Sequence, residues 1–189
     1  MNSMRLFFAL WPPGDLSLAL AGEAKALARR FGGKPARVET IHLTLAFLGE
    51  VDAARLPAVV DAGRRVDAPS FQLVVDRLDC WRHKGLLWAG CAPPPDGLRS
   101  LVMALRGQLR AASIAVDAAP RFVPHLTLVR KAGIAGEAVA MPALEARSWP
   151  CSGFVLVHSR PAPGGREYAL LESFPLPAPR PPGPAEISP

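Results

Sequence analysis

The sequence predicts a single α+β domain in which two sheets carry helices on their outer faces. Apolar strands alternate with helical stretches, Pro- and Gly-rich turns separate them, and one succession of elements occurs twice. With 189 residues, half of them apolar and a fifth charged, the chain has the size and composition of one globular domain. We place this domain at residues 1–174. Residues 175–189 hold seven of the 21 prolines, and we expect them to form a disordered tail.

The repeated unit consists of a strand, a Pro-rich turn, a helix and a second strand. Its two copies comprise residues 5–11, 12–15, 16–32 and 42–50, and residues 85–92, 93–97, 98–113 and 125–131. Proline and a nearby Asp start a helix well, because Pro suits the first turn and Asp can cap free N–H groups. From Pro13 to His42 is 29 residues and from Pro95 to His125 is 30, so the copies run in step. This recurrence indicates an internal duplication.

Other elements lie between and after the repeated units. We expect a helix at 54–67, a strand at 71–81, and strands at 153–160 and 166–174 joined by the turn PAPGG. The longest apolar runs are far below the ~20 residues that cross a bilayer, and the N-terminus lacks the features of a secretory signal. We therefore expect a cytoplasmic protein.

The charge of the chain favours polyanionic partners. The net charge is +6, and 18 of the 22 basic residues are Arg, whose guanidinium binds phosphate through two parallel hydrogen bonds. The three cysteines, Cys80, Cys91 and Cys151, include no CxxC pair, so we interpret them as core residues and not as a disulfide framework or zinc site.

The word HLTL opens the last strand of each repeated unit. Side chains alternate faces along a strand, so His42 and Thr44 share one face and Leu43, Leu45 and Phe47 the other. His125 and Thr127 likewise share a face, opposite Leu126 and Leu128. If the two copies pack about an approximate two-fold axis, two histidines and two threonines meet across a cleft.

This set of residues suits the cleavage of a phosphodiester. Histidine titrates near pH ~6.5, so one imidazole can donate a proton while the other accepts one. Threonine hydroxyls can donate hydrogen bonds to phosphate oxygens, whose charge grows in the transition state.

The motif has two other interpretations. A single strand His is usually structural, but structural accidents have no reason to recur in register. A metal site is disfavoured because Thr is a poor ligand and no carboxylate stands two or four residues after either His. His83 and His158 lie outside the repeat, and we interpret them as surface or hydrogen-bonded residues.

The paired motifs resemble those of the 2H phosphoesterases, most closely the bacterial RNA 2′,3′-cyclic phosphodiesterases, also called the 2′-5′ RNA ligase family. The resemblance covers about Arg5 to Phe174 and includes RLFFALWPP, HLTLAFLGE, PRFVPHLTLVR and GREYALL. It implies two pseudo-symmetric lobes of antiparallel sheet with outer helices around a central cleft, and neither metal nor cofactor. It also implies hydrolysis of a terminal 2′,3′-cyclic phosphate to a 2′-phosphate, with reversible 2′-5′ ligation in some members.

The resemblance also implies roles for individual residues. His42 would be the proton donor and His125 the proton acceptor, and Thr44 and Thr127 would hold the phosphate. Arg130 matches an arginine that closes the second motif. Strand alternation places Arg130 on the face of Leu128, so it reaches the phosphate only if the strand bends or ends near Val129; the alternative is a surface salt bridge.

The expected partners are RNA ends or nucleotides that carry a 2′,3′-cyclic phosphate, bound by a monomer. A second hypothesis is an RNA-end-binding module that keeps the fold without turnover, although binding alone would not require paired proton-transfer groups. The candidates for stacking on an RNA base are Phe47, Trp81, Trp88 and Tyr168. The alternative is that these aromatic side chains are buried in the core.

Overall fold

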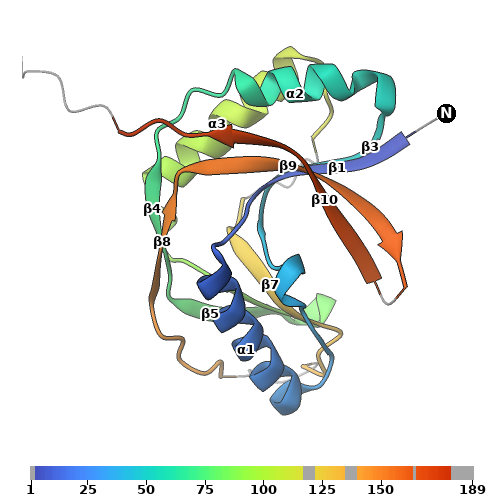
Figure 1. Cartoon of the computed structure of the whole chain (residues 1–189). Coiled ribbons are helices and arrows are strands. Elements are labelled where there is room, and N and C mark those ends of the chain that lie inside the picture. Colours follow the sequence, from blue (N-terminus) through green and yellow to red (C-terminus); the bar gives the residue numbers. More distant parts are fainter. Residues whose placement is uncertain (1–2, 117–121, 135–139, 164, 180–189) are drawn as a thin grey trace, which may run out of the picture.

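The protein is built on one long antiparallel sheet. The computed structural model describes residues 3–116, 122–134, 140–163 and 165–179 (Figure 1). Within these residues the strand order is β10-β9-β1-β3-β7-β6-β5, with the short β2 paired to β7, and β4 and β8 form a separate two-stranded sheet. In chain order the elements are β1 (Ser3–Leu10), α1 (Gly14–Phe31), β2 (Lys34–Pro35), η1 (Val38–Thr40), β3 (Leu43–Asp52), η2 (Ala53–Arg55), α2 (Leu56–Arg64), β4 (Phe71–Val75), β5 (Arg77–Trp81), η3 (Arg82–Lys84), β6 (Leu86–Gly90), α3 (Asp96–Ala111), β7 (His125–Arg130), β8 (Arg147–Cys151), β9 (Gly153–Ala162) and β10 (Gly165–Pro175).

The long sheet has two halves that join at a single residue pair. Strands β10, β9, β1 and β3 form the first half, and β7, β6 and β5 form the second. Between β3 and β7 the pairing is Leu43 with Leu126, the residues that follow the two motif histidines. Since equivalent positions pair with each other, the two copies β1-α1-β3 and β6-α3-β7 are related by an approximate two-fold axis at this point. The predicted α+β fold with two antiparallel lobes is confirmed.

Each half of the sheet is covered by a helix from the other copy. The first copy's α1 packs on β7, whereas the second copy's α3 packs on β3 and against α2, which also contacts β10 (Figure 1). In both helices buried residues recur every three or four positions, as expected of an amphipathic helix. They are Leu16, Leu20, Ala24 and Leu27 in α1 and Leu98, Leu101, Leu105 and Leu109 in α3. This exchange joins both lobes through one apolar core.

The helix starts differ in detail from the prediction. Pro13 and Pro95 are N-cap residues of α1 and α3, and no side chain caps either helix. Asp15 and Asp96 lie in the first turns, where their charges favour the positive end of the helix dipole. None of the helices in the described ranges is long and apolar enough to cross a membrane.

The strand predicted at 71–81 is two strands in different sheets. The break lies at Asp76, which is exposed and whose N–H donates to the Gly90 carbonyl at 3.1 Å. Before the break, β4 pairs with β8; after it, β5 pairs with β6. Strand β8 was not predicted, because Pro150 stands within it; a two-stranded sheet tolerates Pro, since each strand has a free edge.

The prediction of a disordered tail from residue 175 is wrong for its first residues. Pro175 ends β10, and Leu176 is buried in the core. The Leu176 N–H donates to the Ser152 carbonyl at 2.8 Å, and the Pro177 carbonyl accepts from the Ser70 N–H at 2.7 Å. Proline lacks a donor but keeps its acceptor, so a Pro-rich segment can still attach to the domain. Residues 180–189 lie outside the described residues.

Two glycines of α3 provide a test of how closely this helix packs. A Cβ on Gly97 would overlap the Cβ of Phe71 and lie 2.7 Å from its Cγ, whereas a Cβ on Gly107 would meet nothing within 4 Å. Gly97→Ala should lower the free energy of unfolding by about 1–3 kcal/mol, because β4 must move. Gly107→Ala should raise it by up to ~1 kcal/mol, because Ala is the better helix former. Urea unfolding measures both; stabilisation by both variants would contradict the close packing of α3 on β4.

Candidate active site

Both motif strands contain a bulge at the same position after the histidine. In β3, Ala9 pairs with Thr44 and Phe8 with Ala46, so Leu45 has no partner on β1. In β7, Trp88 pairs with Thr127 and Leu87 with Val129, so Leu128 has no partner on β6. Two consecutive side chains are therefore buried in each strand, Leu45 with Ala46 and Leu128 with Val129. A bulge reverses the alternation of faces for the residues that follow it.

The bulges correct two predictions. Phe47 lies on the face of His42 and not on the face of Leu43, and it packs against a small cluster formed by Phe7, Ala9, Val155 and Val157. Arg130 occupies the equivalent position in the second copy. It lies opposite Leu86 and on the face of Thr127, so the predicted place beside Leu128 is wrong. The bulge at Leu128 is the strand irregularity that allows Arg130 to lie on the same face as Thr127.

Each motif histidine is held by the carbonyl of the residue two positions earlier in the chain. His42 Nδ1 lies 2.8 Å from the Thr40 carbonyl, and His125 Nδ1 lies 2.9 Å from the Val123 carbonyl. A carbonyl only accepts hydrogen bonds, so Nδ1 carries the proton in both rings. In each neutral imidazole Nε2 is then the basic nitrogen available for proton transfer.

Aromatic rings surround both imidazoles. Trp11 stacks on His42 with ring centres 5.4 Å apart and an angle of 8°, and Phe7 and Tyr168 also contact it, at 4.8 and 5.1 Å. Trp81 meets His125 edge-on at 4.5 Å, with Trp88 at 6.3 Å. Three of the four predicted stacking residues thus contact a motif histidine, and the fourth, Phe47, lies in the neighbouring cluster.

Phe7 and Trp11 were missed by the analysis of the sequence. They follow the period of two along RLFFALW, which would place both on one face of the strand. Their neighbours on the other face are equally apolar, so nothing in the sequence distinguished the cleft side from the core side.

Burial keeps both histidines neutral. The pKa of His42 is lowered to about 4, mainly by desolvation, which outweighs the hydrogen bond to Thr40; the charges of Arg130 and His125 contribute smaller decreases. Desolvation likewise lowers the pKa of His125, with smaller contributions from Arg130 and Lys84. Arg130 thus lies close enough to act on both imidazoles. A histidine that donates a proton near neutral pH therefore needs its pKa raised above this value.

The remaining histidines and cysteines lie elsewhere. His83 belongs to the exposed turn η3 between β5 and β6, and His158 accepts a hydrogen bond from Arg160 Nε at 3.2 Å. Cys91 and Cys151 are buried, and Cys80 is half-buried. Within the described parts of the chain, no three His, Cys, Asp or Glu side chains are placed to share a metal ion.

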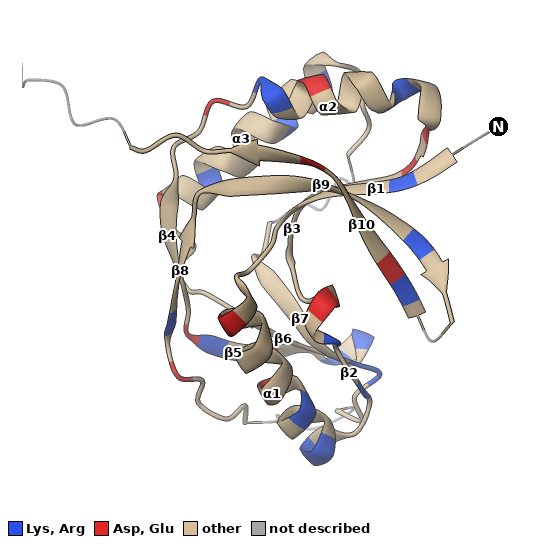
Figure 2. Ribbon diagram, in the orientation of Figure 1, with Lys and Arg blue, Asp and Glu red and all other residues tan. Residues whose placement is uncertain are grey.

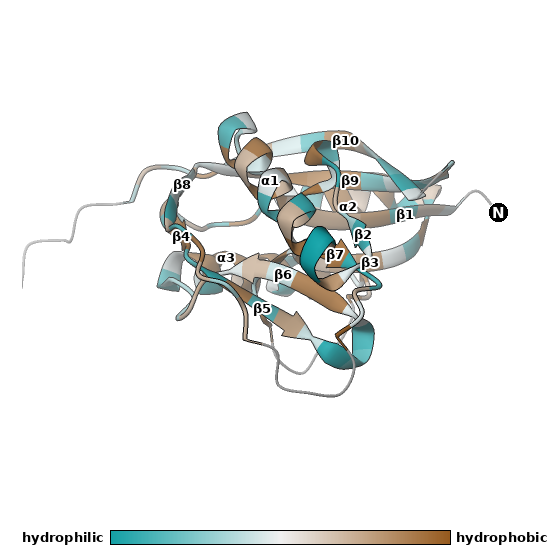
Figure 3. Ribbon diagram, turned by 90° about the horizontal axis from the view of Figure 1, so that it is seen from below, coloured by the Kyte–Doolittle hydropathy of each residue, from teal (hydrophilic) through white to brown (hydrophobic). Residues whose placement is uncertain are grey.

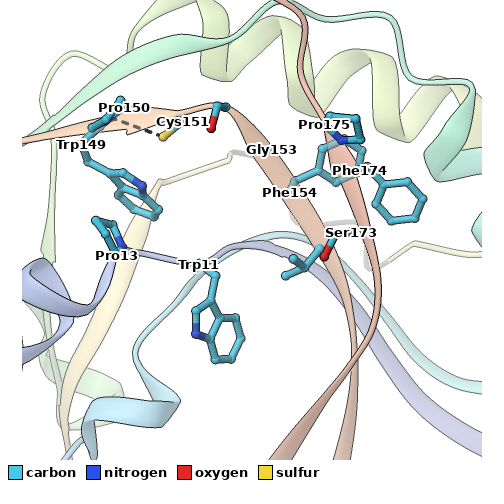
Figure 4. A pocket seen from close by; sticks show the side chains of 12 residues that line it. Trp11, Pro13, Trp149, Pro150, Cys151, Gly153, Phe154, Ser173, Phe174 and Pro175 are labelled. Carbon is cyan, nitrogen blue, oxygen red and sulfur yellow. Dashed lines mark hydrogen bonds between the residues drawn. The ribbon is translucent and has the colours of Figure 1, made fainter.

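Two hollows flank the His42 side of the site. One, of about 490 Å³, is lined by Trp11, Pro13, Trp149, Phe154 and Ser173 (Figure 4). The other, of about 320 Å³, is lined by Arg37, Glu39, Thr40, Glu167 and Tyr168. Trp11 lines the first hollow and Tyr168 the second, and both rings contact His42, which itself lines neither.

Comparisons with known proteins agree with this geometry. Residues 10–88 match the model of the family described as LigT-like phosphoesterases. The RNA 2′,3′-cyclic phosphodiesterase of Escherichia coli is 33% identical over 173 residues, which cover 91% of this chain and 96% of the relative. The chain belongs to the LigT-like phosphoesterases of the 2H family. An RNA 2′,3′-cyclic phosphodiesterase of Thermus thermophilus is 35% identical over 185 residues, 92% of this chain and 90% of the relative.

Solved structures extend the similarity to the whole LigT-like fold. E. coli LigT complexed with 3′-AMP superposes with a TM-score of 0.80 at 32% identity, covering 93% of this chain and 99% of that one. A domain of lower identity, the phosphodiesterase domain of MHV ns2, has a TM-score of 0.53 at 16% identity and shares the fold.

The buried state of His42 predicts its titration. An NMR titration of the imidazole resonances, with His42 assigned through His42→Gln, should show a midpoint near pH 4. The unfolded chain binds this proton below about pH 6.5 and the folded chain only near pH 4, so folding stability should fall as the pH decreases through that window. His42→Gln should make this fall shallower. A midpoint at or above pH 6.5, or a loss of stability that His42→Gln leaves unchanged, would contradict the lowered pKa of His42.

Proposed function

We propose that this protein hydrolyses terminal 2′,3′-cyclic phosphates of RNA to 2′-phosphates by metal-independent acid–base catalysis with His42 and His125. The observation that carries the proposal is the pair of imidazoles on strands joined at the next residue, each with Nδ1 tied to a carbonyl and a threonine two residues later. The E. coli, Thermus thermophilus and Thermotoga maritima relatives are each named RNA 2′,3′-cyclic phosphodiesterase, which supports this reaction.

The reaction needs one proton acceptor and one proton donor. His125 Nε2 takes a proton from water as the water attacks phosphorus, and His42 gives a proton to the departing 3′ oxygen. The product is a 2′-phosphate beside a free 3′ hydroxyl. In 2′-5′ ligation a 5′ hydroxyl takes the place of water and the two histidines keep these roles; the roles are exchanged when the 2′-5′ linkage is cleaved back to the cyclic phosphate. The assignment of donor and acceptor follows the family resemblance.

Binding of the substrate can raise the pKa of the donor histidine. In the free protein the pKa of His42 is about 4, so the imidazole is neutral near pH 7. A bound phosphodiester carries one negative charge, which favours the imidazolium and raises the pKa of a neighbouring histidine. The donor thus becomes protonated as the phosphate binds.

The other cleft residues are assigned to the phosphate and the nucleoside. Thr44 and Thr127 are half-buried on the same faces as the histidines and can donate hydrogen bonds to non-bridging oxygens. Arg130 adds a positive charge that acts on both imidazoles. Trp11 and Tyr168 line the hollows beside His42 and offer ring faces or edges to a terminal base.

Turnover in the presence of a chelator separates this function from its alternatives. The protein should convert 2′,3′-cyclic AMP to 2′-AMP at an undiminished rate after exhaustive EDTA treatment, with ³¹P NMR identifying the 2′ product. The reason is that imidazoles provide both proton transfers. Activity that disappears with EDTA and returns with a divalent ion would exclude the metal-free mechanism. Binding without turnover at high enzyme concentration would favour a non-catalytic RNA-end-binding module.

The threonine hydroxyls should act mainly on the rate. Thr44→Val and Thr127→Val remove a neutral donor while keeping the shape of the side chain. Each should lower kcat/KM by roughly 30- to 1000-fold, or about 2–4 kcal/mol of transition-state stabilisation. Thr44→Ser and Thr127→Ser keep the hydroxyl and serve as controls that should recover much of the rate. Val variants with normal activity would show that the hydroxyls do not bind the phosphate.

An activated leaving group tests which histidine is the donor. A nitrophenolate departs from a nucleoside 4-nitrophenyl phosphodiester without a proton, whereas the attacking water still needs a base. With this substrate His42→Ala should recover most of its lost kcat/KM, and His125→Ala should not. Recovery by His125→Ala alone would exchange the two roles, and recovery by neither variant would refute the acid–base pair.

A further inference from the structure

We propose that the RNA strand leading to the cyclic phosphate binds along a basic ridge on the second half of the sheet, so that oligoribonucleotides are preferred over mononucleotides. The inference rests on the proposed function and names the substrate class of that site. The ridge is formed by Arg29, Arg30, Lys34, Arg82, Lys84, Arg130 and Lys131.

Four segments that are distant in the sequence meet to form the ridge. The Gly133 N–H donates to the Phe31 carbonyl at the end of α1, at 2.7 Å, and the Ala132 N–H donates to the Gly85 carbonyl after η3, at 2.9 Å. Lys34 of β2 lies opposite Arg130 of β7. Figure 2 shows Lys and Arg at the end of α1 and in the segments beside β2 and β7, and Figure 3 shows hydrophilic residues there.

The charges of the ridge are available to a ligand. All seven side chains are exposed, and within the described ranges none of them forms an ion pair with a carboxylate. Basic residues elsewhere are often paired, as in Arg5 with Glu50, Arg64 with Asp61 and Glu172, and Arg147 with Glu145. An uncompensated row of cations is the electrostatic feature that attracts a phosphate backbone.

Contacts connect the ridge to the active site. Lys84 Nζ lies 5.1 Å above the ring of Trp81, and Trp81 meets His125 edge-on at 4.5 Å. Arg130 belongs both to the ridge and to the site, since its charge acts on both imidazoles. A strand that leaves the catalytic phosphate therefore meets a half-buried aromatic ring and then successive cations. This combination is typical of single-stranded nucleic-acid sites, which join base stacking to backbone contacts.

The opposite direction offers a less favourable path. Beyond His42 the cleft wall is the apolar cluster of Phe7, Ala9, Val155 and Val157 with Phe47 on it. The polar hollow on that side contains Glu39 and Glu167 beside Arg37, which is already paired with Glu39 at 3.0 Å. Phosphates would meet carboxylates in this hollow. The exposed Arg160 and Arg166 of β9 and β10 also lie on the His42 side, so the ridge is favoured by its larger number of cations.

Binding of a product RNA tests the ridge without requiring turnover. The probe is a fluorescein-labelled ten-nucleotide RNA ending in a 2′-phosphate, measured by anisotropy, with 2′-AMP as competitor. The RNA should bind at least ~10-fold more tightly than 2′-AMP at low salt. Each of Arg30→Gln, Lys34→Gln and Arg82→Gln should reduce the slope of log affinity against log salt by about 0.7, the share of one phosphate contact on a single strand.

The controls separate the ridge from a general charge effect. Arg110→Gln removes an exposed charge from α3, which covers the other half of the sheet, and should leave the slope unchanged. Turnover of 2′,3′-cyclic AMP should be unchanged in the ridge variants, because they lie outside the catalytic residues. A polyglutamate of equal charge that displaces the RNA as well as unlabelled RNA does would mark a general polyanion surface and overturn the RNA assignment.

The outcomes distinguish this inference from the proposed function. Equal affinity for RNA and 2′-AMP, or a salt slope that the ridge variants leave unchanged, would refute the ridge even if 2′,3′-cyclic AMP is hydrolysed. Tight, ridge-dependent binding of the RNA by a protein that hydrolyses neither substrate would refute the proposed function and support the ridge.

Discussion

The pairing of Leu43 with Leu126 is the constraint on which the cleft depends. It is the one place where β3 and β7 meet, and it joins the residues that follow the two motif histidines. Because the same position of both copies lies at the join, the histidines of the two copies lie on either side of it, and each threonine shares the face of its own histidine. The exchanged helices reinforce the join, since α1 packs on the second half of the sheet and α3 on the first. The lobes therefore cannot separate without exposing the shared core.

Two equivalent bulges place different side chains at equivalent positions of the two copies. After each bulge the fifth residue from the histidine returns to the cleft face, and the copies place Phe47 and Arg130 there. The first half of the cleft thus becomes aromatic and apolar, with Trp11, Phe7 and Tyr168 around His42, while the second half carries a cation. A symmetric pair of histidines has no inherent direction, whereas in the proposed function an apolar wall on one side and a charge on the other would orient a phosphodiester.

Packing of aromatic rings around the histidines determines the pKa of the imidazoles. The aromatic rings that fix the imidazoles also exclude water, and this desolvation lowers the pKa of both. In the proposed function, the anionic substrate would raise the pKa of the donor and so restore the proton that it needs. The carbonyl bonds at Nδ1 determine which nitrogen takes part, so the segment before each strand, and not the strand alone, prepares the histidine.

The sequence by itself determined the repeated unit and the fold class and indicated the candidate site residues, because the repeated HLTL motif and the alternation of apolar residues are local properties of the chain. Only the tertiary structure decided where Phe47 and Arg130 lie, since a bulge depends on the pairing of a strand with its neighbour. The division of 71–81 into two strands and the attachment of Leu176 to the core depend on partners distant in the sequence. The state of the histidines was decided there as well, because a pKa depends on burial among side chains such as Trp11 and Trp81 that only the fold brings to them.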